Sequence, residues 1–205
     1  MFSVVVDFGL TLTLIVMISE QGVDEDKIVG NFFGLRLLSG FLLFSLAPLT
    51  VLALPWSSTI DQAVLLGALA YFLMGGASML VGVFQRHESI WRAALAELLG
   101  RAVLLVLVAL IAIRSPGVVE MIAASVVANG IWLLAMVKLA KPFVHIRPRF
   151  EWNEWARIIT RSWPIAVSII FNLLYLKGDI LFLAYFRPQA EVGLYGMAYR
   201  IIDVM

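Results

Sequence analysis

Charged side chains inside otherwise apolar stretches are the residues of this sequence best able to do chemistry. They are Asp7, Arg36, Glu97, Arg101, Lys177, Asp179, Arg200 and Asp203. A charge near the centre of a membrane helix costs about 2.5–3.5 kcal/mol. Residues that costly usually face a polar cavity or an oppositely charged partner. They are therefore candidates for lining a polar pathway.

Pairing along one helix is the simpler alternative, and it fits some of these charges better than others. Glu97 and Arg101 are four residues apart, so they can pair on one helix face. Lys177 and Asp179 are two residues apart and do not face each other on a regular helix. Each charge taken alone is compatible with either role.

The cations make a stronger case together than singly. They occur in four different apolar stretches and are Arg36, Arg101, Lys177 and Arg200. Packing alone explains such a spread poorly, whereas an interior that attracts an anion explains it well. Arg and Lys are natural partners of phosphate or diphosphate.

The elements that position these charges are predicted to be membrane-spanning helices. The chain is 62% hydrophobic and 14% charged, against about 45–50% and 25% for a soluble domain. Since a spanning helix needs roughly 20 apolar residues, spans are predicted at 1–19, 29–54, 62–85, 90–113, 117–138 and 163–186. A seventh begins near 191 and continues to Met205. Strands of a barrel would be shorter and alternating, so we expect an all-α integral membrane bundle of six full helices and a truncated seventh.

Both ends lie in helix-like sequence, which favours a piece of a larger two-lobed transporter over a complete small protein. The one long connector, from Lys138 to Arg161, separates five spans from two. We therefore expect a first lobe at 1–140, a linker at 141–162 and the start of a second lobe at 163–205. Within the linker, Trp152, Trp155 and Ile159 recur at helical spacing. This stripe predicts a short amphipathic helix on the membrane surface, from about 152 to 160, with a solvated linker as the alternative.

Basic residues predict the orientation. Alternate connectors lie on opposite sides of a membrane, and the set 20–28, 85–92 and 138–161 holds nine of the 15 Lys and Arg residues. The opposite set holds Arg114 and Arg187. The positive-inside rule therefore places the first set, including the long connector, in the cytoplasm.

Composition argues against several other classes. The chain has no cysteine and only two histidines, both in connectors, so we expect no metal site and no thiol chemistry. A net charge of +1 gives no indication of nucleic-acid binding. No phosphate-binding glycine loop or nucleophile motif is present. We therefore expect neither an enzyme nor a cofactor.

Loose motifs along the chain carry a family resemblance. They include Ser162-Trp163-Pro164, Tyr175-x-Lys177-x-Asp179 and Val192-Gly193-x-Tyr195-x-x-Ala198-x-Arg200, preceded in order by Asp7-Phe8-Gly9-Leu10, Leu35-Arg36, Phe84-Gln85-Arg86 and Glu97 to Arg101. The sequence resembles the polysaccharide (O-antigen type) flippases of the multidrug/oligosaccharidyl-lipid/polysaccharide exporter superfamily. Lys177 stands where Arg is more usual in that family.

The resemblance implies a MATE-like fold and a transport function. The chain would correspond to about the second through the start of the eighth helix of a longer, two-lobed bundle. Such proteins carry undecaprenyl-diphosphate-linked oligosaccharide from the cytoplasmic to the periplasmic leaflet of the bacterial inner membrane, through a central cavity that is often cationic. The implied partners are this lipid-linked substrate, the bilayer and a coupling ion of open identity. The cavity candidates are Arg36, Arg101, Lys177, Arg200, Asp7, Asp179 and Glu97.

Three other functions stay open at this point. A drug or cation antiporter of the same superfamily would prefer acidic cavity residues, against which the four cations argue. A membrane glycosyltransferase or polymerase of the same pathway would need a catalytic periplasmic loop. A non-transporting membrane partner or scaffold would need neither feature.

Overall fold

Helices and the connectors between them make up the part of the chain that the structure describes. The computed structural model describes residues 9–53, 58–114, 117–186, 192–193 and 195–197. The helices in this part are α2 (Leu10–Ile18), α3 (Glu25–Ala53), α4 (Ser58–Met79), α5 (Val81–Arg86), α6 (Ile90–Arg114), α7 (Val118–Ala140) and α8 (Trp152–Phe186). No strand occurs in these residues. The predicted all-α class is therefore confirmed.

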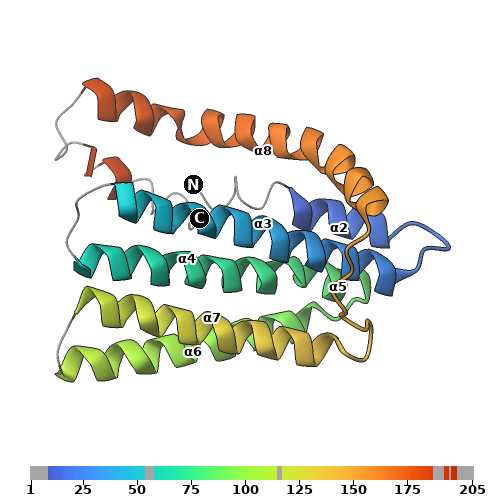
Figure 1. Ribbon diagram of the computed structural model, residues 1–205, viewed down its shortest axis with the longest axis horizontal. Coiled ribbons are helices and arrows are strands. Elements are labelled where there is room, and N and C mark those ends of the chain that lie inside the picture. The colour runs from blue at the N-terminus through green and yellow to red at the C-terminus, as the bar shows by residue number, and fades with distance from the viewer. Residues whose placement is uncertain (1–8, 54–57, 115–116, 187–191, 194, 198–205) are drawn as a thin grey trace.

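Long helices lie side by side in the order α3, α4, α7 and α6, with α8 on the other side of α3 (Figure 1). Small residues explain the closest approaches. A Cβ atom added to Gly100 of α6 would lie only 2.8 Å from the Cβ of Trp132 in α7. In lipid, the surroundings are as apolar as the helices, so the hydrophobic effect does not drive helices together. Helices associate there by close packing at small residues.

Within the described residues, four helices are long and apolar enough to cross a membrane. They are Thr59–Arg86, which joins α4 and α5 across Leu80, then Ile90–Arg114, Val118–Ala140 and Trp152–Leu176. Their mean hydropathy ranges from 1.4 to 2.4. These spans support the interpretation of the chain as a membrane protein. The expected count of six complete spans and a truncated seventh stays a prediction, as does the division into two lobes.

The three basic connectors meet at one end of the bundle, called here the connector end. It holds the α2–α3 loop, the α5–α6 turn and the α7–α8 connector (Figure 1). The largest fully buried side chains gather near this end and include Met17, Phe32, Phe84 and Met136. The best-packed part of the chain therefore lies where the basic residues are concentrated.

The start of α8 differs from the expected short surface helix. Residues 152–160 are helical, but they continue without a break through Pro164 to Phe186. Trp155 and Ile158 are buried, at 6% and 1% exposure, whereas Trp152 is 78% exposed. The physical reason is that the apolar face of these turns packs on the bundle itself. Of the predicted stripe, only Trp152 and Ile159 are therefore exposed and able to contact the membrane surface.

Candidate functional site

Arg36, one of the predicted cavity residues, is buried between helices. It is only 6% exposed and lies on α3 against α4. A Cβ atom added to Gly75 of α4 would lie 2.7 Å from the guanidinium carbon of Arg36, so the missing side chain makes room for the cation. The small cavity beside it also reaches Leu133 of α7. Arg36 thus places a positive charge at the junction of α3, α4 and α7.

Glu97 and Arg101 form the ion pair that their spacing predicts. Arg101 Nη2 lies 3.2 Å from Glu97 Oε1, and the two side chains are 61% and 48% exposed. They border a narrow space between α6 and α7 that also touches Trp132, whose buried indole N–H has no hydrogen-bond partner among the described residues. Arg36 and Arg101 therefore line different inter-helix spaces.

The remaining candidates are located only in part. Lys177 and Asp179 belong to the helical backbone of α8. Asp7, Arg200 and Asp203 lie outside the described residues. The role of all these charges in a common cavity stays a prediction.

A cluster that the sequence did not reveal fastens α8 to α3. We call Lys27, Asn31, Glu151, Glu154 and Trp155 the α3 clasp. Asn31 is fully buried. Its side-chain oxygen accepts a hydrogen bond from the Glu151 backbone N–H at 3.0 Å, and its backbone carbonyl accepts one from the Trp155 indole N–H at 3.1 Å. Lys27 Nζ lies 3.1 Å from Glu151 and 3.0 Å from Glu154.

Two glycines let the connector lie directly on α3 beside this clasp. The Arg149 backbone N–H donates a hydrogen bond to the Gly30 carbonyl at 2.9 Å. A Cβ atom on Gly34 would overlap the carbonyl oxygen of Arg149. The available sequence signal was the four-residue spacing of Gly30 and Gly34, which is typical of close backbone approach in membranes.

Acidic residues of the α2–α3 loop and the start of α3 complete the joint. Glu20 pairs with Arg157 at 3.3 Å and also with Arg161, both on α8. Asp26 accepts a hydrogen bond from the His145 backbone N–H at 2.8 Å. The clasp and these pairs join the α2–α3 region to the connector and to the first turns of α8.

The charges of the α3 clasp limit the pH range over which it stabilises the folded state. The hydrogen bond from Lys27 holds the pKa of Glu151 below its ordinary value of 4.5. Hydrogen bonds to Glu154 and then Glu151 raise the pKa of Lys27 above 10.5. Because folding lowers the pKa of Glu151, ionised Glu151 stabilises the folded state fully above pH 4.5, and this stabilisation is lost as pH falls through the lowered pKa. Because folding raises the pKa of Lys27, protonated Lys27 stabilises the folded state fully below pH 10.5, and this stabilisation is lost as pH rises through the raised pKa.

We expect a Glu151→Gln variant to be less stable than the parent at neutral pH and to approach it in acid. The physical reason is that the parent's own Glu151 becomes neutral below its lowered pKa. Unfolding midpoints of both proteins in one detergent, measured from pH 7 downwards, check this. A stability gap that stays constant well below pH 4.5 would contradict the assigned pairing.

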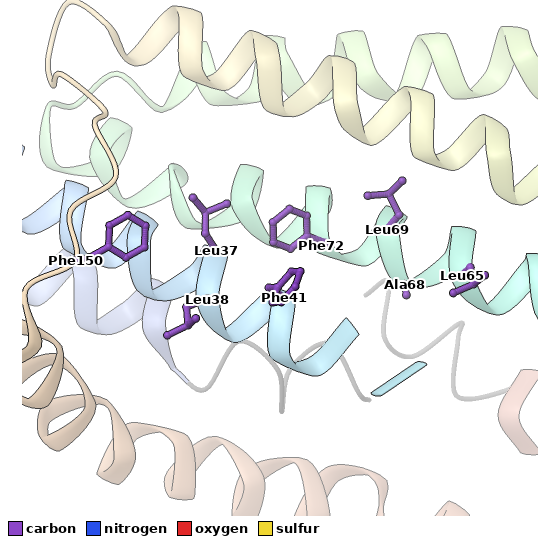
Figure 2. Close-up of a pocket in the computed structure, with 8 residues that line it drawn as sticks. All are labelled: Leu37, Leu38, Phe41, Leu65, Ala68, Leu69, Phe72 and Phe150. Carbon is purple, nitrogen blue, oxygen red and sulfur yellow. The ribbon is translucent and has the colours of Figure 1, made fainter. Parts of the chain in front are cut away.

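An apolar groove of about 570 Å³ runs along α3 and α4. Figure 2 shows its lining, which comes from both helices and from the connector: Leu37, Leu38, Phe41, Leu65, Ala68, Leu69, Phe72 and Phe150. Leu37 and Phe72 also border the small cavity at Arg36. The buried cation and the apolar groove are therefore neighbours on the same helix pair.

Comparison with known protein families gives a match. A family model described as polysaccharide biosynthesis protein matches residues 1–205, the whole chain. No curated protein matches the chain. No solved structure matches it either.

Proposed function

Because the chain belongs to the family of polysaccharide biosynthesis proteins, we propose that it is part of a flippase for polyprenyl-diphosphate-linked oligosaccharide. Membership of this family supports a role in polysaccharide synthesis or export. The proposed step is transfer of the lipid-linked glycan across the bacterial inner membrane, with the connector end in the cytoplasm. On this proposal the protein is a transporter of the O-antigen type and not an enzyme.

The single observation that supports transport best is a positive charge held inside a bundle of apolar helices. Arg36 is 6% exposed, so its guanidinium, which stays charged at any physiological pH, is held away from water among these helices. A diphosphate needs such partners when it leaves water, since charge-assisted hydrogen bonds replace its lost hydration. Lys177 and Arg200, in the two stretches that best resemble the flippase family, would add to the same interior.

The test is glycan export in cells that depend on this protein. Lys177→Ala and Arg200→Ala each remove one charge-assisted contact, worth about 1.5–3 kcal/mol, so export should fall roughly tenfold or more. Surface polysaccharide and membrane protein levels are measured together. Lys138→Ala is the matched control, because Lys138 is exposed near the connector end of α7. Normal surface polysaccharide in both test variants would reject the role.

A further inference from the structure

The α3–α4 groove and the connector beside it together span about half of a bilayer's hydrocarbon core. The groove extends along α3 from Leu37 to Phe41, and the connector backbone is fixed to the same helix at Gly30. At a rise of 1.5 Å per residue, Gly30 and Phe41 are about 16 Å apart along α3. The hydrocarbon core of a bilayer is about 30 Å thick. A lipid with its headgroup at the connector and its acyl chain in the groove would therefore reach from the edge of the core to near its middle.

The groove is wholly apolar and accessible from outside. Among its lining residues Phe41 is 71% exposed, and Leu65 and Leu69 are each 44% exposed. None of the eight side chains that line it carries a charge or a polar group. A flexible hydrocarbon chain is the ligand that such a surface accepts without leaving polar groups unsatisfied.

One end of the groove is basic. Phe150 forms its wall there (Figure 2). Arg149 and the exposed Arg147 precede Phe150 in the connector. Glu151 is shared between Lys27, at 3.1 Å, and Arg149, whose Nη1 is 4.0 Å away, at the limit of an ion pair. Arg147 is exposed, Arg149 holds Glu151 only at this outer distance, and guanidinium groups match phosphate geometry well.

Two exposed aromatic side chains lie in the chain next to the arginines at the basic end of the groove. Phe150 is 65% exposed and Trp152 is 78% exposed. Aromatic residues collect at the boundary between headgroups and hydrocarbon. The basic end of the groove therefore lies where lipid phosphates are found, and the apolar part extends from there into the core.

From this juxtaposition we propose that the α3–α4 groove binds one anionic phospholipid from the leaflet on the connector side. An acyl chain lies along Leu38, Phe41 and Leu69, and the phosphate contacts Arg147 and Arg149. The bound lipid fills the space beside the connector and fixes Phe150 over α3. The proposal concerns a resident lipid and does not depend on what the protein transports.

The experiment is native mass spectrometry of the whole purified protein with added lipid. Phosphatidylglycerol and phosphatidylcholine with identical acyl chains are compared at equal concentration. The parent should retain one phosphatidylglycerol in preference to phosphatidylcholine. The double variant Arg147→Gln, Arg149→Gln should lose this preference by about tenfold or more, because two charge-assisted contacts disappear, while the Arg149 backbone bond to Gly30 remains.

A groove-filling variant tests the apolar part separately. Ala68→Trp places a large side chain in the groove and should abolish retention of both lipids. Ala94→Trp adds the same side chain at an exposed position of α6 and should bind like the parent. Unchanged retention in Ala68→Trp, or no preference for phosphatidylglycerol in the parent, would overturn the proposal. Preferential retention of undecaprenyl phosphate at equal concentration would overturn it too, by making the groove a substrate site.

Discussion

Replacing Trp155 with alanine is expected to lower the free energy of unfolding by about 3–5 kcal/mol, the usual cost of removing a large buried aromatic side chain. Trp155 is 6% exposed and belongs to the main apolar cluster. Its ring centroid lies 5.7 Å from that of Phe150, and its indole N–H donates to the Asn31 carbonyl at 3.1 Å. Its loss would leave a cavity and an unsatisfied carbonyl where α8 meets α3. Unfolding monitored in one detergent measures the change.

Trp152 provides the control for this prediction within the same helical turn. It is 78% exposed, so Trp152→Ala should change stability by no more than about 0.5 kcal/mol. A Trp155→Phe variant keeps an aromatic ring but removes the indole donor and part of the buried volume, so its stability should lie between those of the parent and Trp155→Ala. Equal losses in Trp155→Ala and Trp152→Ala would show that the apolar stripe faces the membrane, as the sequence alone suggested.

Helix positions set by local composition could be predicted from the sequence. The spans predicted at 90–113 and 117–138 correspond to α6 (Ile90–Arg114) and α7 (Val118–Ala140). Each is a continuous apolar run bounded by polar or helix-breaking residues, so length and hydropathy are sufficient. The Glu97–Arg101 ion pair could also be predicted from the sequence, because residues four apart on a helix are neighbours.

The α3 clasp could not be predicted, because its partners are brought together only by the tertiary fold. Asn31 and Glu151 are 120 positions apart in the chain. Asn31 stands within an apolar run, where helical spacing offers its side chain only the backbone carbonyl of Lys27, one turn earlier. The same limit explains Trp155, since periodicity shows that a helix has an apolar face but not whether protein or lipid covers that face. For Arg36, burial cost predicted a polar cavity or an oppositely charged partner, but only the fold shows Gly75 making room for its side chain.

Replacing Gly34 with alanine is expected to detach the connector from α3 and speed tryptic cleavage after Arg149 about five- to 150-fold. The added methyl group would overlap the Arg149 carbonyl oxygen. That oxygen is backbone, so the overlap cannot be relieved by a side-chain rotation, and overpacking of this kind costs about 1–3 kcal/mol. When trypsin cuts only the detached connector, the cleavage rate is proportional to the population of that detached state. The rate therefore rises by the factor that corresponds to this free-energy cost. Arg147 precedes Pro148 and resists trypsin, so the cut after Arg149 is identified by fragment mass.

Gly67→Ala separates this effect from the general consequences of changing glycine in a helix. Gly67 lies in α4, and a Cβ atom there would meet nothing within 4 Å. Alanine is favoured over glycine in a helix by about 1 kcal/mol, so this variant should be at least as stable as the parent and equally resistant at Arg149. Gly34→Ala gains the same helix propensity, and faster cleavage would therefore have to come from the contact with the connector. If both variants were cleaved after Arg149 at the parent's rate, the connector could not be lying on Gly34 in the membrane-embedded protein.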